Sequence, residues 1–441
     1  MQPDLFHQEK RLYDRLCEPE MLYHGFVEVR RNKGAPGIDK VTISDFESNL
    51  EQELARLSEE LTNWRYKPKP VRQVEIPKPG TTEKRKLGIP CIRDRVVDST
   101  LKQLLEPILV PHFSMHSYGF IPGKGQHDAV LAAQRIVQSG KETVVDIDLS
   151  KFFDRINHDR LIHRLGTQIP DKRILRLIGM KLRSGIMKDG LVSSTPEGAI
   201  QGSPLSPLLS NVVLDELDKE LERRNLAFCR YADDCNIFVK THKAGERVMG
   251  SITRFIEGRL KLQVNQRKSQ VAPSEQVRFL GMTIVKGTVS ISKESINRAM
   301  EKVKALTPKG THETLEATME RINRWYKGWS GYYSLTQYPS QLAKIEAHVR
   351  RRLRSRLVDQ QKSRKNLYNK LRKRGVSHRS AAKWVFTNDK RWVLSNRRCL
   401  TKAYPVLLFT VELGQYIRST QRLPLKWLDF HGHTNSSSLE G

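Results

Sequence analysis

The sequence has few cysteines, and no two of them form a metal-binding pair. The five cysteines stand at positions 17, 91, 229, 235 and 399, and there is no C-x-x-C motif. Zinc knuckles and fingers need closely spaced cysteine pairs, and disulfides belong to oxidising compartments. The pattern argues against a zinc knuckle or finger, and against the paired-cysteine scaffold of some endonuclease domains. It favours a reducing compartment, so we expect a cytoplasmic protein.

Long apolar runs are also lacking. The longest stretch without a charged residue, 198–214, contains Gln201, Asn211 and two prolines, so it cannot cross a bilayer. The first residues, Met1-Gln2-Pro3-Asp4, do not form an apolar signal segment. We therefore expect a protein without a membrane segment.

Acidic residues are scarce relative to basic ones. The chain of 441 residues has 77 Lys and Arg against 48 Asp and Glu, which gives a net charge of +29. A surplus of this size indicates a polyanionic partner, and nucleic acid is a better fit than an acidic membrane surface. The hydrophobic fraction of 38% is typical of a globular protein, and the length allows two or three domains.

The most informative stretch is Arg230-Tyr231-Ala232-Asp233-Asp234. Short apolar runs flank it on both sides, a pattern that predicts a β-hairpin with the two carboxylates at its tip. Adjacent carboxylates repel each other unless solvent or a cation neutralises them. A pair of Mg²⁺ ions would do so, and a solvated turn is the alternative.

A third carboxylate stands at the end of another predicted strand. Residues 142–149 alternate so that Asp146 and Asp148 point to the same face. A carboxylate at the end of a buried strand needs a partner. A metal shared with Asp233 would provide one, and capping of the following helix is the alternative.

Two further segments are suited to a nucleotide. Residues 72–76 and 87–89 predict a hairpin that carries Arg72, Lys78 and Arg85, and such a hairpin can bind a triphosphate or remain a solvated basic surface. The Gly- and Pro-containing turn at Gln201-Gly202 can place a glutamine against a nucleotide, or the glutamine can cap the following helix.

The N-terminal part predicts a basic loop between helices. The 32–37 loop is rich in glycine and proline and follows Arg30 and Arg31, so it can lie against a phosphate backbone or act as a connector. A helix is expected over residues 44–64, capped by Ser44.

The C-terminal part changes to long basic helices. Residues 341–400 contain 19 Lys or Arg and 3 acids, which predicts amphipathic helices with a phosphate-binding side. The aromatic cluster at 325–333 indicates a helix-packing core with close backbone contacts, or a surface on which bases stack. Residues 401–434 are expected to form a small nucleic-acid-binding appendage, and 435–441 resemble a linker or cloning remnant.

Taken in order, these motifs resemble a bacterial group II intron reverse transcriptase over about residues 20–420. The family's Tyr-x-Asp-Asp motif is matched by Tyr231 to Asp234, and its first-strand motif by Asp148 with Phe153. The resemblance implies an α+β right-hand polymerase with fingers, a palm built on a small antiparallel sheet, and an all-α thumb. With no zinc-type endonuclease sequence after the thumb, the compact kind is expected.

The resemblance also implies domains and site residues. Fingers and palm would span 1–292, with an N-terminal extension over about 1–45, and the thumb or maturase domain 293–400. Two catalytic Mg²⁺ ions, or Mn²⁺ in their place, would bind to Asp148, Asp233 and Asp234. The nucleotide-binding residues would be Arg72, Lys78, Arg85, Phe153, Gln201 and Gly202, with Phe153 as the steric gate against a ribose 2′-hydroxyl. Template and primer would contact Arg30, Arg31, Lys33, Lys124, Lys268, Arg350, Arg351 and Arg354.

Two positions depart from the family pattern. Ile121 stands where the family usually has an arginine, which removes one cation on the template side. Ser203 stands where a second glycine is common.

The sequence therefore predicts an RNA-directed DNA polymerase that extends a DNA or RNA primer with dNTPs on an RNA template, and that also binds intron RNA as a maturase. A free-standing relative that serves its host in DNA repair or defence is one alternative. An RNA-binding splicing factor without polymerase activity is another.

Overall fold

The computed structural model describes residues 12–77, 84–188, 191–193, 197–199, 201–308, 310–361 and 363–405. The chain divides into two compact units, Met1–Pro273 and Ser274–Gly441. Each unit has its own hydrophobic core. Among the described residues, no helix is long and apolar enough to cross a membrane.

The first unit begins with a layer of helices. These are α2 (Leu12–Cys17), α3 (Pro19–Arg31), α4 (Ile43–Ser48), α5 (Leu50–Thr62) and α6 (Ile92–Leu109). Helix α5 buries Leu54, Leu57 and Leu61, which recur at helical spacing. The expected single helix over 44–64 is instead two helices, and its predicted cap was wrong. Thr42 caps α4 in a capping box with Asp45, because the helix begins one residue before Ser44.

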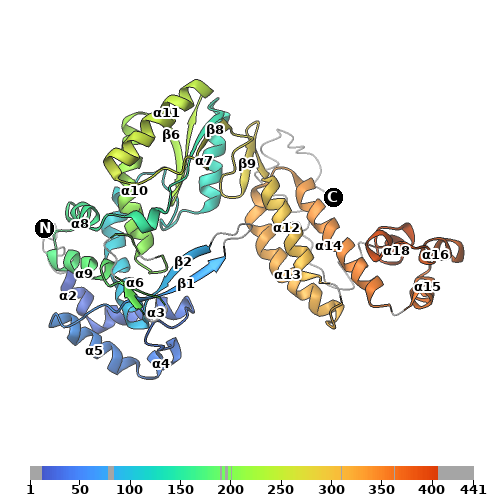
Figure 1. Cartoon of the computed structure of the whole chain (residues 1–441), viewed down its shortest axis with the longest axis horizontal. Helices are drawn as coiled ribbons and strands as arrows, with labels where there is room; N and C mark the ends of the chain where they lie inside the picture. The colour runs from blue at the N-terminus through green and yellow to red at the C-terminus, as the bar shows by residue number, and fades with distance from the viewer. Residues whose placement is uncertain are drawn as a thin grey trace, which may run out of the picture. The chain divides into compact units, whose positions relative to one another are not determined.

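The predicted basic hairpin is present at the edge of a four-stranded sheet. Strands β1 (Val71–Pro77) and β2 (Lys84–Ile89) pair antiparallel, and β4 (Ile186–Lys188) and β5 (Leu191–Ser193) complete the order β2-β1-β4-β5. Figure 1 shows β1 and β2 as a long blue hairpin that extends from this sheet. Lys78 lies outside the described residues, so its position is not part of the structure.

A second four-stranded sheet is wholly antiparallel, as the sequence predicted. Its strands are β3 (Thr143–Ile147), β6 (Ala227–Tyr231), β7 (Asp234–Val239) and β8 (Gln270–Pro273), in the order β6-β7-β3-β8. Helices α7 (Gln126–Gln138) and α10 (Ser206–Arg223) contact β6, and α11 (His242–Phe255) contacts β3 and β8. The remaining helices of this unit are η1 (Val110–His112), η2 (Phe152–Arg155), α8 (His158–Gly166), α9 (Lys172–Leu182) and the π-helix η3 (Ile256–Leu260).

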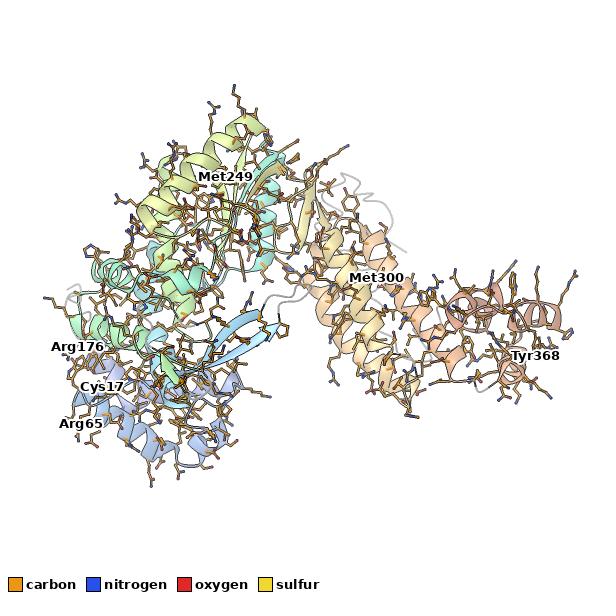
Figure 2. All side chains as sticks on the ribbon, viewed as in Figure 1. Cys17, Arg65, Arg176, Met249, Met300 and Tyr368 are labelled. Atoms are coloured by element: carbon orange, nitrogen blue, oxygen red, sulfur yellow. The ribbon has the colours of Figure 1, made fainter. Side chains whose placement is uncertain are left out.

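The second unit combines a small hairpin with basic helices. The hairpin consists of β9 (Met282–Val285) and β10 (Thr288–Ile291), and its main chain accepts and donates hydrogen bonds with Gln337 and Gln341. The helices are α12 (Lys293–Leu306), α13 (Leu315–Tyr332), η4 (Tyr333–Leu335), α14 (Pro339–Asp359), α15 (Arg364–Lys373), α16 (His378–Val385), α17 (Arg391–Leu394) and α18 (Arg398–Ala403). Figure 2 shows all their side chains, with Met300 labelled on α12 and Tyr368 on α15.

The aromatic cluster of α13 contributes to the core of this unit. Tyr326 is 1% exposed and donates a hydrogen bond to the Glu346 carboxylate at 2.8 Å. Tyr333 is also buried and its ring lies against Trp329. Close backbone contacts were expected at the glycines of this cluster, and that expectation was wrong for Gly328 and Gly331. A Cβ added at Gly328 or Gly331 would meet no atom within 4 Å, because both glycines lie on the open face of the helix.

Candidate active site

A two-residue turn presents the predicted aspartate between β6 and β7. Tyr231 pairs with Asp234, which leaves Ala232 and Asp233 as the turn. Ala232 has a φ of +57°, a left-handed conformation that an L-residue adopts only when its surroundings enforce it. One neighbour is Gly119, where an added Cβ would lie 2.3 Å from the Ala232 nitrogen. The glycine therefore allows the 118–120 segment to pack directly on the turn.

A buried arginine holds the same turn from inside. Arg230 is fully buried, and its guanidinium forms a bidentate ion pair with Asp218 at 2.7 and 2.5 Å. Its Nη1 also donates to the Ala232 carbonyl at 2.9 Å and to Asn211 Oδ1 at 3.0 Å. Asn211 in turn donates to the Gly119 carbonyl at 2.8 Å. Charged hydrogen bonds of this kind are strong inside a protein, so this network sets the position of the turn.

The strand order brings the first-strand aspartate beside the hairpin. The β3–β7 register runs from Thr143 opposite Val239 to Ile147 opposite Cys235, so one further step places Asp148 opposite Asp234. Asn265 Nδ2 donates to the Asp148 carboxylate at 3.1 Å, and the Asp148 amide donates to Ser269 Oγ at 3.0 Å. These contacts orient Asp148 at the end of β3.

The carboxylates of Asp148 and Asp233 interact electrostatically. The pKa of Asp233 is raised, first because protein surrounds the carboxyl and then because the negative charge of Asp148 is close. A hydrogen bond from the Asp233 main chain opposes this shift, and so do the cations of Arg85 and Arg230. A divalent cation between the two carboxylates would relieve the repulsion.

The donor set fits Mg²⁺ that is bound together with substrate. Within the described parts of the chain, no group of three or more His, Cys, Asp or Glu side chains is arranged to hold a metal ion. Mg²⁺ is usually bound by one or two carboxylates, with substrate phosphates and water completing its shell. Asp148 and Asp233 meet that requirement, and Asp234 begins β7 next to them.

A cavity of about 610 Å³ opens beside the turn. It is lined by four of the predicted nucleotide-binding residues, Arg85, Phe153, Gln201 and Gly202, together with Asp233. The volume lies within the range of small-molecule sites. The structure therefore brings a cation, an aromatic ring, a glutamine and a carboxylate together around one space.

The Gln201-Gly202 turn is tied to the basic hairpin. The Gly88 amide of β2 donates to the Gln201 carbonyl at 2.7 Å. Gly202 has a φ of +119°, and a Cβ there would lie 2.4 Å from the Gly88 carbonyl oxygen, so this position requires glycine. The next residue, Ser203, donates to the buried Asp98 at 2.7 Å, and Asp98 also pairs with Lys181 at 2.9 Å.

The predicted steric gate is held by neighbouring backbone. The Ala199 amide donates to the Phe153 carbonyl at 2.7 Å, and the Gly198 amide donates to the Ile156 carbonyl at 2.8 Å. The buried His158 ring lies 2.7 Å from the Gly198 carbonyl. This places η2, which carries Phe153, beside the segment that leads to Gln201.

Arg72 lies on β1 and is not among the described lining residues of the cavity. Its Nε and Nη2 both donate to the Pro36 carbonyl, at 3.1 and 2.8 Å. Arg95 similarly donates to the Ala35 carbonyl, and a Cβ at Gly37 would lie 2.6 Å from Cys91. Arg72 thus holds the 32–37 loop against the fingers, and its contact with nucleotide phosphates stays a prediction.

The predicted template-side cations of the first unit fall into two groups. Arg30, Arg31, Lys33 and Lys268 are exposed, and Arg30 pairs with Glu47 at 3.1 Å. Lys124 is instead half-buried and bonded to main-chain carbonyls. Its ammonium donates to the carbonyls of Met115 and Ser117, each at 2.9 Å, and lies over the Tyr118 ring. Ile121, which stands where the family usually has an arginine, is buried.

Two of the three predicted arginines of α14 contact α17 and the residue that follows it. The Arg351 guanidinium lies 4.0 Å from the Trp392 ring centroid and donates to the Trp392 carbonyl at 3.2 Å. Arg354 is buried and donates to the Ser395 carbonyl at 3.0 Å. The Arg351 and Arg354 contacts attach α17 to α14, whereas Arg350 lies 3.9 Å from Glu346 of α14 itself. A direct role of the three arginines on template and primer stays a prediction.

The sequence comparisons match both units. Residues 76–284 match the reverse transcriptase (RNA-dependent DNA polymerase) family, and residues 296–375 match the group II intron maturase-specific domain. Protein YkfC of Escherichia coli K12 is 32% identical over 318 residues, which cover 63% of this chain and 83% of that protein. The chain belongs to the group II intron reverse transcriptases. This membership confirms the predicted enzyme class and α+β polymerase fold.

This group II intron reverse transcriptase is also similar to a group II intron-encoded protein. LtrA of Lactococcus lactis is 27% identical over 382 residues, which cover 71% of this chain and 62% of LtrA. Among solved structures, a telomerase from Candida albicans aligns with a TM-score of 0.42 and 12% identity, covering 74% of this chain and 68% of the other. A Cas6-RT-Cas1–Cas2 complex gives a TM-score of 0.37 and 24% identity over 56% of this chain and 42% of its own.

Sequence reasoning missed the residues that support the turn. Arg230, Asp218, Asn211 and Gly119 were not predicted to have a role at the site. Arg230 offered a signal, because an arginine between apolar strand residues is rarely buried without a partner. Its partners lie 12 and 19 residues away in sequence, and Gly119 lies 92 residues from Asn211, so spacing alone did not reveal them.

Proposed function

We propose that this reverse transcriptase joins nucleotides by two-metal nucleotidyl transfer, with Asp148 and Asp233 as the metal-binding carboxylates and Asp234 beside them. The observation that supports this most strongly is the β3–β7 register, which brings Asp148 beside the turn whose Asp233 lines the cavity. When bound, Mg²⁺ ions would lower the pKa of the primer 3′-hydroxyl and neutralise charge on the leaving pyrophosphate.

The other residues of the cavity would bind the incoming dNTP. Arg85 would neutralise the outer phosphates, and we predict the same role for Lys78 from the sequence. Gln201 would contact the base or sugar without charge repulsion. Phe153 would exclude a 2′-hydroxyl by occupying its space. The hydrogen bond from the Gly88 amide to the Gln201 carbonyl links two walls of the cavity.

The match of residues 296–375 to the maturase-specific domain favours a second activity. We propose that the second unit binds intron RNA and supports splicing, in addition to holding template and primer. Its basic helices supply the charge for phosphate contacts. This role is separable from polymerisation, because it needs RNA binding without the carboxylates.

Primer extension tests the proposed polymerase. The wild-type protein, an RNA template with an annealed DNA primer, dNTPs and Mg²⁺ should give full-length cDNA. D233N should give none, while its affinity for the template–primer stays within a few fold of wild type. Absence of product from the wild type would leave only the RNA-binding role. A large loss of affinity in D233N would mean that the carboxylate supports the fold instead of the chemistry.

A further inference from the structure

A second cleft lies in the first unit, and it shares no lining residue with the nucleotide cavity. It measures about 470 Å³ and is formed by α8, α10 and the π-helix η3. Its lining consists of Arg160, His163, Arg164, Thr167, Glu216, Gly258, Arg259 and Lys261. Four permanent cations therefore face a single carboxylate, so the cleft carries a net positive charge.

One carboxylate organises two of these arginines. Arg160 Nη2 donates to both oxygens of Glu216, each at 2.8 Å, and Arg259 Nε donates to Oε1 at 3.1 Å. The Arg259 side chain is 71% exposed despite this contact. A guanidinium has five N–H donors, so both groups are fixed in place with donors left to bind an anion.

Neighbouring groups strengthen the arrangement. Arg164 donates to the buried Asp215 at 3.0 Å, which holds a third guanidinium on the same side. Although burial opposes it, hydrogen bonds from Arg160 and Arg259 lower the pKa of Glu216, so this carboxylate is ionised at neutral pH. The cluster is held by these charges and does not depend on a ligand to form.

The π-helix places the last cations in the cleft. Residues 256–260 adopt π geometry, and Lys261 follows with a φ of +58°. A π-turn is a costly conformation that recurs at functional sites. Here Gly258 and Arg259 of the π-helix line the cleft, together with Lys261 just after it.

We propose that this cleft binds backbone phosphates of RNA that lies outside the catalytic cavity. The inference rests on the proposed function, in that RNA is the substrate of the enzyme. None of the described lining residues is Phe, Tyr or Trp, so the cleft has no large aromatic surface for base stacking, and His163 supplies its single ring. The cleft would therefore bind RNA without reading its sequence, through guanidinium–phosphate pairs.

Gly258 offers a clean test, because a Cβ added there meets no atom within 4 Å. G258D puts a carboxylate into the cleft, G258K adds a cation, and G258A controls for the loss of glycine. Binding of a long hairpin RNA is measured as a function of salt. G258D should bind on the order of tenfold more weakly than G258A, and G258K at least as tightly as G258A.

A second pair of variants shows whether a loss of RNA affinity comes from the charge of the cleft or from misfolding. R259E/K261E reverses two charges in the cleft, and K243E/R254E reverses two exposed charges on α11, outside it. The first should weaken hairpin binding and make it less salt-dependent, with extension of a short template–primer unchanged. Equal RNA affinity of G258D and G258A overturns the inference, as does an equal loss in K243E/R254E. Failure of the wild type to extend primers would instead overturn the proposed function and leave these binding comparisons intact.

Discussion

At the scale of single residues, the site depends on charges that are unfavourable in the absence of substrate. Asp233 carries a raised pKa because protein and Asp148 both disfavour its ionised form. The spacing of acids on two predicted strands was enough to identify this pair. Asn265, which bonds to Asp148, lies 117 residues away, and Arg230 is fixed by Asp218 on α10, so these contacts could be found only from the structure.

Replacing Asp233 should therefore stabilise the metal-free fold. An acid whose pKa is higher in the folded than in the unfolded state lowers stability as pH rises through the interval between these values, and the loss persists at neutral pH. D233N should raise the Tm in EDTA at neutral pH, and this gain should shrink as pH falls toward the ordinary carboxyl pKa. Thermal melts across pH measure it. Mg²⁺ with template–primer and dNTP should raise the Tm of the wild type more than that of D233N.

Arg230 should contribute to both stability and activity. R230M leaves Asp218 charged and buried, which should cost about 3–5 kcal/mol in the free energy of unfolding. R230M/D218L removes both charges, so its stability in urea titrations should return close to that of wild type. Extension should stay impaired in the double variant, because the Ala232 carbonyl still lacks its donor. Full activity in that variant would show that the network serves the fold alone.

At the scale of elements, turns decide where the functional groups lie. The hairpins β1–β2 and β6–β7 were predictable, because an alternating run in the first and short apolar runs in the second adjoin turn-forming residues. The start of α4 was misjudged by one residue, since Thr42 and Ser44 are both good caps and the capping box with Asp45 favours Thr42. The link from Ser203 to Asp98 was not predictable, because it joins residues 105 apart.

Ser203 gives the turn before α10 a contact that a glycine would not make. S203A should leave the buried Asp98 with one fewer donor and reduce stability by about 1–3 kcal/mol. Because the Gln201-Gly202 turn would be held less firmly, we expect KM for dNTP to rise more than kcat falls. S210A is the matched control, since the Ser210 hydroxyl bonds to Pro207 within α10. Steady-state kinetics with equal effects in S203A and S210A would argue against this role.

At the scale of the whole molecule, the two units have separate cores. The large core of the first unit and the core around Leu353 share no residue. Charge composition predicted a change of character near residue 293. It did not predict that β9–β10 would join the second unit, because that choice depends on hydrogen bonds to Gln337 and Gln341.

Separate cores should produce two unfolding transitions. L101A in the first unit and L353A in the second each empty a fully buried site and should cost about 2–5 kcal/mol. Each should lower the temperature of one calorimetric transition and leave the other unchanged. A single transition that shifts with both variants would mean that the units unfold together.

The central claim is that the carboxylates of β3 and of the β6–β7 turn hold the catalytic metal ions. Counting bound Mn²⁺ by electron paramagnetic resonance tests it most directly, in the wild-type protein with template–primer and a non-hydrolysable dNTP. We expect two ions per complex in the wild type and a loss of tight binding in D148N and in D233N. Unchanged Mn²⁺ binding in both variants would contradict the assignment.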